Sequence, residues 1–248
     1  MSNFTDNGLS PTSRYNDGSY IKKNNTYHIH DSPWKAAQID KIISRNKLNI
    51  SKICEIGCGA GKILKQLSFN PKFTSTAFSG YEVSKSAFDL CLPLESENLK
   101  FYLEDLLNKD ITYDVVLCID VFEHVENYMG FLKKLRHKGK YKIFHIPLDL
   151  SVSSLIRKRL IYSRDQVGHL HYFSPETAIE TLKDCGYEII DTMFTLSLIN
   201  SPEKSFKTKL LNFPRKLLFA ISPNLMSTLI GGASLMVIAK WYSDQFYL

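Results

Sequence analysis

The sequence of 248 residues has few cysteines and no long hydrophobic run. Its five cysteines are odd in number and show neither a C-x-x-C pair nor the spacing of a zinc site, which argues against a disulfide framework and favours a reducing compartment. No stretch reaches the roughly 18 apolar residues of a membrane span, and residues 1–27 lack the apolar block of a signal peptide. We therefore expect a cytoplasmic protein.

Acidic residues are scarce in two stretches, although the overall charge is moderate. In total, 31 Lys and Arg against 25 Asp and Glu give a net charge of +6. Residues 133–142 contain six Lys and Arg and no acid, and residues 203–216 contain five with one acid, Glu203. A solvated helix face and loop is the simplest interpretation. The alternative is a field that attracts an anionic acceptor or an anionic membrane surface.

Residues 52–67, KICEIGCGAGKILKQL, have the pattern of a strand, a tight turn and a helix. The turn contains three alternate glycines, Gly57, Gly59 and Gly61, and Glu55 stands two residues before the first. Glycine lets a ligand lie directly against the backbone, so we expect the turn to be a binding surface. Its G-x-G-x-G spacing differs from the G-x-G-x-x-G of dinucleotide-binding folds.

These four residues occupy the places of the E/D-x-G-x-G-x-G motif, and through them the chain resembles the class I S-adenosylmethionine-dependent methyltransferases. The resemblance implies an α/β, Rossmann-like fold: a seven-stranded, mostly parallel sheet with an antiparallel strand 7 and helices on both faces. It also implies S-adenosyl-L-methionine as the cofactor. Cys58, between the glycines, is a departure that the family tolerates, and it joins the expected cofactor-binding residues.

Acidic residues also follow the next two expected strands. Glu82 and Val83 end the second strand, and Glu82 lies one strand-helix-strand interval after the glycine motif. A carboxylate there can accept hydrogen bonds from both ribose hydroxyls. The third strand, residues 99–103, precedes Glu104 and Asp105. The resemblance implies that one of them contacts the adenine amino group, and the register of the apolar residues favours Asp105.

An expected fourth strand, residues 114–119, is nearly all apolar and leads into Asp120-Val121-Phe122-Glu123-His124. This D-x-x-E-H is similar to the acid-x-x-E-H of the ubiquinone-pathway O-methyltransferases, whose side chains are associated with a divalent metal. At i, i+3 and i+4 the three polar residues would share one helical face. A metal site, acceptor positioning or base chemistry, and helix capping all stay open, and no metal belongs to the expected set. The N-P-P-Y motif of nucleobase methyltransferases is absent, which argues against a nucleic-acid partner.

Histidines supply the remaining acceptor-site candidates, because imidazole is the side chain that titrates near neutral pH. His145 stands at the end of the expected fifth strand, at the sheet edge where open α/β folds bind ligands, unless it is a satisfied core residue. His169 and His171, two residues apart, would point the same way in an extended segment, and Tyr172 joins them. The alternative for these residues is a polar loop that fixes the next helix cap. With Asp120 and His124, the three histidines form the expected catalytic set.

The expected organisation is a polar N-terminal segment (1–30), partly disordered or forming a lid, and one methyltransferase domain (31–248). Asp31-Ser32-Pro33 is a helix-opening signal, a capping side chain followed by Pro at the first helical position, and the helix is expected to run to about Arg45. Its Trp34 either flanks the cofactor or packs. Insertions at about 150–172 and 200–230 would form the acceptor pocket or a lid. The second is basic and amphipathic, so a membrane-resting or dimer-forming surface is the alternative. We expect a monomer or a homodimer.

The resemblance implies methyl transfer to a small-molecule acceptor, anionic in keeping with the basic stretches. The chain looks like the bacterial branch placed beside polysaccharide-modifying enzymes. The expected acceptor is therefore an O-nucleophile on a sugar, a nucleotide sugar or a secondary-metabolite precursor. Four alternatives remain. Two are a quinone- or lipid-type O-methyltransferase at the membrane surface and a non-catalytic S-adenosylmethionine-binding protein. The others are a nicotinamide oxidoreductase, whose pyrophosphate favours G-x-G-x-x-G, and a nucleic-acid methyltransferase.

Overall fold

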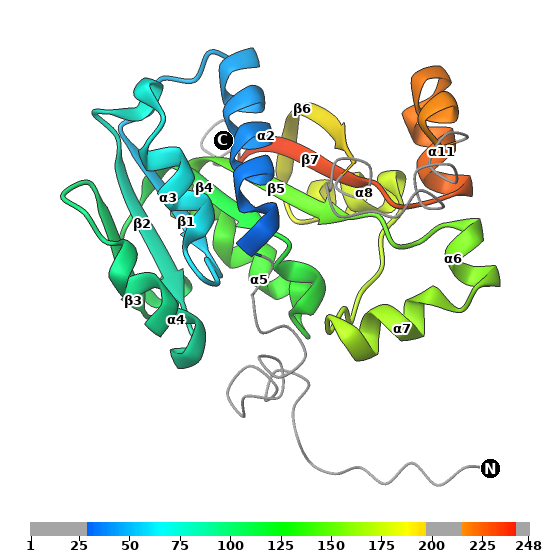
Figure 1. Cartoon of the computed structure of the whole chain (residues 1–248), viewed down its shortest axis with the longest axis horizontal. Coiled ribbons are helices and arrows are strands. Elements are labelled where there is room, and N and C mark those ends of the chain that lie inside the picture. The colour runs from blue at the N-terminus through cyan, green and yellow to red at the C-terminus, as the bar shows by residue number, and fades with distance from the viewer. Residues whose placement is uncertain (1–28, 197–214, 242–248) are drawn as a thin grey trace, which may run out of the picture.

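A single seven-stranded sheet organises the protein in the computed structural model, which describes residues 29–196 and 215–241 (Figure 1). The strand order is β3-β2-β1-β4-β5-β7-β6. The strands are β1 (Lys52–Ile56), β2 (Ala77–Glu82), β3 (Leu99–Leu103), β4 (Tyr113–Ile119), β5 (Gly139–Pro147), β6 (Tyr187–Thr195) and β7 (Ser234–Trp241). β7 is antiparallel to both neighbours and the other pairings are parallel. The predicted fold class is confirmed.

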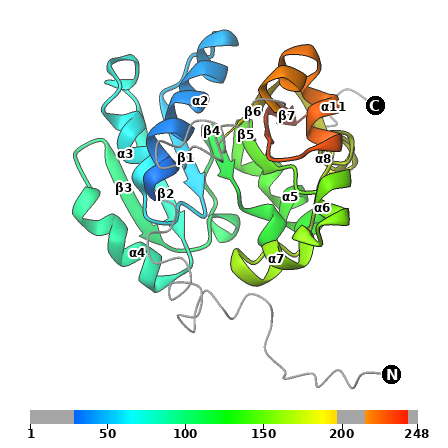
Figure 2. The same ribbon diagram turned by 45° about the vertical axis from the view of Figure 1, so that its right-hand side comes forward.

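Helices cover both faces of the sheet (Figures 1 and 2). They are α2 (Ser32–Arg45), α3 (Lys62–Ser68), α4 (Lys85–Cys91), α5 (Tyr128–Leu135), α6 (Val152–Ile156), α7 (Arg159–Gln166), α8 (Pro175–Asp184) and α11 (Pro223–Leu229). Buried side chains of α2, α3 and α4 form one core cluster, whereas those of α5, α8 and α11 form a second. The sheet therefore separates two apolar layers.

β4 shows why the sheet has a core on each face. Its side chains alternate in direction: Val115 and Leu117 belong to the cluster of α2 and α3, and Val116 and Cys118 belong to the cluster of α5 and α8. All four are fully buried. A strand with two buried faces needs a continuous apolar sequence, which is the pattern that identified it.

The helix starts follow the local sequence in one case and depart from it in another. At α8, Ser174 and Thr177 form a reciprocal capping box ahead of Pro175. At α2 the proline lies in the first turn as expected, but the residue before the helix, Asp31, has helical dihedral angles and its side chain makes no capping hydrogen bond. Asp31 instead faces the cavity described below.

The topology places a binding crevice at one edge of the sheet. The chain order reverses between β1 and β4, which are neighbours in the sheet. Open α/β sheets bind ligands beyond the carboxyl ends of the strands at such a reversal. Of the expected lid segments, residues 1–28 and 197–214 lie outside the described residues; residues 215–221 form a helix that leads to α11.

Candidate active site

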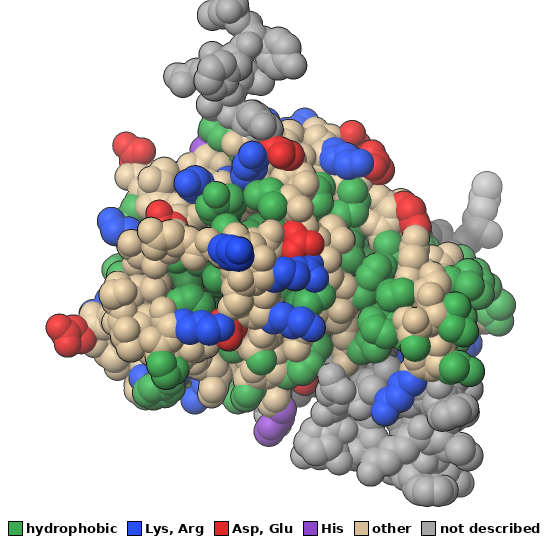
Figure 3. Space-filling model, turned by 90° about the horizontal axis from the view of Figure 1, so that it is seen from above, with side chains coloured by type: hydrophobic (Ala, Val, Ile, Leu, Met, Phe, Trp, Pro, Cys, Tyr) green, Lys and Arg blue, Asp and Glu red, His purple; other side chains and the backbone are tan. Residues whose placement is uncertain are grey.

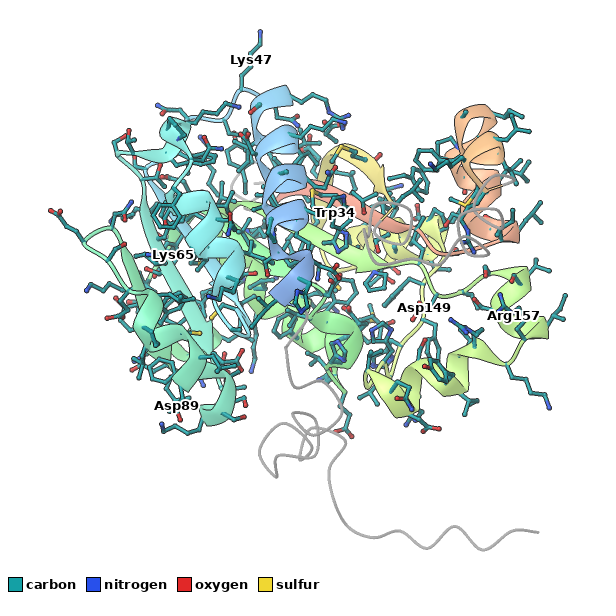
Figure 4. All side chains as sticks on the ribbon, in the orientation of Figure 1. Trp34, Lys47, Lys65, Asp89, Asp149 and Arg157 are labelled. Carbon is teal, nitrogen blue, oxygen red and sulfur yellow. The ribbon has the colours of Figure 1, made fainter. Side chains whose placement is uncertain are left out.

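A cavity of about 420 Å³ lies at the carboxyl ends of β1, β4 and β5. Its wall includes the glycine turn from Gly57 to Ala60 and the first residues of α2. The segment around His169 and the start of β7 at Ser234 line the far side of the cavity. Figure 4 shows α2 with Trp34 on one side of the sheet edge and Asp149 on the side from which α6 and α7 extend. Ligand cavities range from roughly 300 to 1,000 Å³, so a small-molecule cofactor fits this scale.

The glycines of the turn differ in what surrounds them. Gly59 has φ +56°, and a β-carbon added there would meet no atom within 4 Å. At Gly61, with φ +68°, an added β-carbon would lie 2.6 Å from the Phe101 ring. Gly61 is therefore required by packing, whereas Gly59 leaves open space against bare backbone. That space belongs to the cavity, since Gly59 lines it.

Glu82 holds the glycine turn in place through hydrogen bonds to backbone N–H groups. Its carboxylate accepts hydrogen bonds from the N–H groups of Gly59 (2.9 Å), Val83 (2.9 Å) and Ser84 (2.8 Å). Burial raises the pKa of Glu82, and these three hydrogen bonds oppose that rise. A carboxylate has about four acceptor sites, so about one remains for a ligand hydroxyl.

Glu55 is a buried acid at the floor of the cavity. It is 1% exposed, and its Oε2 has no hydrogen-bond partner among the described residues. Burial raises its pKa to about 8, the positive charge of Lys35 lowers it, and the charges of Glu82 and Asp120 raise it further. A buried carboxyl oxygen without a partner is costly. Glu55 therefore suits a ligand that brings a positive charge to its free oxygen, such as the ammonium or sulfonium group of S-adenosylmethionine.

Asp120 lies at the centre of a charged network that joins five elements. Its carboxylate contacts Lys35 Nζ (2.7 Å) and His145 Nδ1 (2.5 Å). His145 Nε2 lies 2.9 Å from Thr195 Oγ1, which donates to the Ser234 carbonyl. The network thus ties α2 to the ends of β4, β5, β6 and β7.

Both ring nitrogens of His145 are engaged in this network. The Asp120 carboxylate accepts a hydrogen bond from Nδ1, and Nε2 faces the Thr195 hydroxyl. Burial raises the pKa of Asp120, but the charges of His145 and Lys35 outweigh it and hold that pKa well below its usual range. With both ring nitrogens engaged, His145 is not arranged as a base.

Glu123, His124 and His169 form a second polar cluster, of which His124 and His169 line the cavity. One potential metal-ligating atom from each lies within 4.8 Å of the others. The 3-10 helix η6 (Phe122–His124) carries the first two, and the Glu123 carbonyl accepts from Leu170 N–H (2.9 Å) and the N–H of residue 171 (3.1 Å). These bonds hold the segment after α7 against η6.

The predicted trio of Asp120, Glu123 and His124 does not share one helical face. Asp120 has φ +53° and lies before η6 begins, so the i, i+3, i+4 spacing does not apply to it. His169 takes its place in the cluster. Asp149 accepts a hydrogen bond from His169 Nδ1 (2.5 Å).

Several expected site residues lie outside the lining of this cavity: Glu82, which reaches it through the Gly59 N–H, and Val83, Glu104, Asp105 and His171. Val83 is 62% exposed, Glu104 pairs with Lys109, and Asp105 caps the 3-10 helix η5 (Leu106–Asn108) through Leu107 N–H. His171 does not point the same way as His169: its Nε2 lies 3.0 Å from the Val125 carbonyl, and its ring packs on Tyr128. Cys58 and His145 line the cavity as expected positions.

Three polar residues of the site were not identified from the sequence: Lys35, Asp149 and Thr195. Each acts through a partner distant in the chain. Lys35 had one indirect signal, its place on the first turn of a helix expected to lie over the cofactor. Asp149 and Thr195 had none, because strand-end polar residues are common.

Comparison with known proteins adds the family. The sequence matches the model of a methyltransferase domain over residues 28–192, more than half of the chain. The chain belongs to this methyltransferase family. The resemblance found from the motifs, to class I S-adenosylmethionine-dependent methyltransferases, is thereby confirmed at the level of the family and the fold.

Similar proteins include the ubiquinone biosynthesis O-methyltransferases of Rickettsia. That of Rickettsia bellii is 37% identical over 112 residues, which cover 41% of this chain and 45% of that protein. That of Rickettsia canadensis is 33% identical over 171 residues, covering 61% of this chain and 69% of that protein. The methyltransferase chain thus spans about half the length of the first of these relatives.

Solved structures share the fold at low sequence identity. Magnesium protoporphyrin IX methyltransferase from Synechocystis PCC 6803, with bound SAH, has a TM-score of 0.58 at 15% identity, covering 96% of this chain and 100% of that one. The plantazolicin methyltransferase BpumL, in complex with a monoazolic desmethylPZN analog and SAH, has a TM-score of 0.60 at 18% identity, covering 94% of each chain.

Proposed function

We propose that the protein transfers a methyl group from S-adenosylmethionine to a hydroxyl oxygen of a small-molecule acceptor. The observation that carries the proposal is the open backbone at Gly59 beside the unpartnered, buried oxygen of Glu55, in one cavity that continues to His124 and His169. Gly59 and Glu55 fit the methyl donor. His124 and His169 lie where an acceptor would meet the donor. Family membership supports the reaction type.

The residues present fit this cofactor by charge as well as by shape. The donor carries an ammonium, a carboxylate and a sulfonium group. Glu55 provides a buried acid, and Lys35 provides a cation on the same cavity wall. The open backbone at Gly59 allows the close approach of a nucleoside, and Glu82 retains acceptor capacity next to it.

The bound donor supplies an already reactive methyl group, so the protein's contribution is positioning and exclusion of water. In an in-line displacement, the acceptor oxygen forms a bond to the methyl carbon as the bond from that carbon to sulfur breaks. The products are the methyl ether and S-adenosylhomocysteine, and the acceptor's hydroxyl proton is lost. We propose that His124 and His169 bind the acceptor hydroxyl and assist the loss of its proton.

The acceptor is proposed to be a hydroxyl compound of the sugar, nucleotide-sugar or secondary-metabolite type. Incubation of the protein with labelled S-adenosylmethionine and fractionated metabolites, including nucleotide sugars, tests this. Label in a hydroxyl-bearing product supports O-methylation. A protein that binds S-adenosylhomocysteine but labels no fraction would instead support the non-catalytic binding role.

A lipid-type acceptor at a membrane surface is the second candidate, and one surface favours it. Leu155, Ile156, Ile161 and Tyr162 of α6 and α7 are 56–77% exposed, next to the basic residues 157–159. Hydrophobic side chains also gather on the side of the molecule that carries α11 (Figure 3). The relatives named for ubiquinone biosynthesis are consistent with an acceptor of this class.

Co-sedimentation with vesicles separates the two candidates. A lipid-type acceptor predicts binding to vesicles that contain phosphatidylglycerol, weak binding to pure phosphatidylcholine, and a loss of binding in Ile156→Ser combined with Ile161→Ser. Equal recovery in the supernatant with every vesicle would exclude this candidate. No helix within the described ranges is long and apolar enough to cross a bilayer.

A further inference from the structure

A second cavity, of about 570 Å³, lies at the edge of the sheet opposite the candidate active site, and we call it the amino-end cavity. Its lining includes the first residue of each of three parallel strands and the last residue of the antiparallel β7: Lys52, Tyr113, Gly139 and Trp241. The candidate active site lies at the carboxyl ends of the same parallel strands. The strands therefore separate the two cavities, and a ligand in one does not contact a ligand in the other.

Positive charge dominates the lining of the amino-end cavity. Lys52, Arg136 and Lys140 line it, against one acid, Asp114. Asp114 Oδ2 already accepts hydrogen bonds from the N–H groups of Ser51 (2.7 Å) and Lys52 (2.9 Å). Among the described residues, no carboxylate forms an ion pair with any of the three cations. A recess with positive charge of this kind focuses the field and attracts anions.

The basic stretch of the sequence, residues 133–142, supplies two of these three cations. Lys138 and Lys142 are not available to a ligand in the same way, because both donate to backbone carbonyl groups and Lys142 is fully buried. Arg136 and Lys140 line the cavity. No residue of the stretch lines the candidate active site. The stretch therefore has no part in the methyl transfer proposed above.

The Arg136 guanidinium is held in one orientation by its neighbours. Its Cζ lies 5.4 Å from the centre of the Trp241 ring, Nε donates to His137 Nε2 (3.2 Å), and Nη1 lies 3.5 Å from the Cys185 carbonyl oxygen. Within the described part of the chain, Nη2 makes no hydrogen bond. A guanidinium is a rigid fork of N–H donors that matches a phosphate group. Since this fork is already ordered, it loses little freedom when a ligand binds.

His137 adds a further donor to the lining. Desolvation lowers its pKa, and the positive charges of Arg136, Lys142 and Lys138 lower it further. Because the Arg136 Nε–H can only donate, His137 Nε2 accepts, and the neutral ring carries its proton on Nδ1. The cavity thus combines cations and N–H donors, which suit the oxygens of an anion.

We propose that the amino-end cavity binds the phosphate groups of a small phosphorylated ligand, and that Arg136 and Lys140 contact these phosphates. Ligand cavities range from roughly 300 to 1,000 Å³, so about 570 Å³ has room for a diphosphate or triphosphate rather than a single phosphate. This binding does not depend on the proposed function, because the two cavities share no lining residue.

The test is calorimetry of the full-length protein with pyrophosphate and with adenosine triphosphate, each with S-adenosylhomocysteine present in excess. We expect one site per chain. Arg136→Gln should weaken pyrophosphate binding about 10- to 100-fold and Lys140→Gln about 10-fold, through the loss of charge-assisted hydrogen bonds. Lys133→Gln is the matched control, because it removes the same charge from the same stretch outside the lining, and it should leave the affinity unchanged. Tighter binding of adenosine triphosphate than of pyrophosphate would identify the ligand as a nucleotide.

The fluorescence of Trp241 provides a readout that needs no change to the cations. The sequence has two tryptophans, Trp34 and Trp241, so all tryptophan emission in Trp34→Phe comes from Trp241. Pyrophosphate should change this emission over the same concentration range as in calorimetry. If Arg136→Gln fails to fold, this titration and Lys140→Gln decide.

Three results would overturn the proposal. They are the absence of saturable pyrophosphate binding, equal weakening by Lys133→Gln and Lys140→Gln, and binding that appears only when S-adenosylhomocysteine is left out. The last result would assign the pyrophosphate to the candidate active site. Retained pyrophosphate binding in a protein that does not bind S-adenosylhomocysteine would overturn the proposed function alone.

Discussion

The stability of the protein should depend on pH through Glu55, and Glu55→Gln should remove that dependence. In the folded protein, burial keeps the Glu55 carboxyl protonated up to a pKa of about 8. In the unfolded chain a glutamate loses its proton near pH 4.3. Between these values the folded state holds a proton that the unfolded state lacks, so the free energy of unfolding falls as the pH rises.

The size of the effect follows from the same shift. Each pH unit inside the window changes the free energy of unfolding by about 1.4 kcal/mol per proton. From about pH 6 to about pH 8 the Glu55 contribution should therefore fall by about 2 kcal/mol, allowing for half-titration near the upper limit. The positive charge of Lys35 lowers the pKa of Glu55, so it reduces the fall in the free energy of unfolding but does not reverse it.

Urea unfolding of the wild-type protein and of Glu55→Gln at the two pH values measures the difference. The wild-type protein should lose about 2 kcal/mol more than the variant over this range. Glu180→Gln, an exposed glutamate on α8 paired with Lys183, is the control and should follow the wild type. A constant gap between wild type and Glu55→Gln at both pH values would refute the reasoning.

Two further predictions concern the glycine turn and the Asp120 network. Gly59→Ala should weaken S-adenosylhomocysteine binding, measured by calorimetry, and should cost only about 1–2 kcal/mol of stability for its left-handed backbone. Gly61→Ala should destabilise the fold more in urea unfolding, because its β-carbon also meets the Phe101 ring. Equal stability of the two variants would contradict this distinction. Lys35→Met should cost about 1–3 kcal/mol by leaving the Asp120 carboxylate short of a cation. The double variant with Asp120→Asn should recover part of that loss, and strict additivity in the cycle would argue against the pairing.

Local sequence patterns predicted the fold well, because the backbone conformation of each strand and turn depends on residues close together in the chain. The apolar β4 segment and the three alternate glycines each specify one conformation with few alternatives. The order of the motifs then fixed the family, since consecutive strand ends in a parallel sheet meet at one edge.

The side-chain partners could not be predicted in the same way. Asp120 was expected to join Glu123 through helical spacing, but its left-handed backbone turns the chain before η6 and directs the carboxylate to Lys35 and His145. His169 was expected to match the next histidine in an extended segment. Gly168, with φ +86°, and the bonds to η6 fold that segment instead.

The central claim, that the glycine turn and its supporting acid bind the nucleoside of a methyl donor, is tested most directly by calorimetry with S-adenosylhomocysteine. The account predicts one site per chain in the wild-type protein. It predicts at least about 10-fold weaker binding by Glu82→Ala, which removes one charge-assisted acceptor and frees the Gly59 N–H, with Glu180→Ala unchanged. Equal affinity of Glu82→Ala and the wild type, or no binding by the wild type, would contradict the claim.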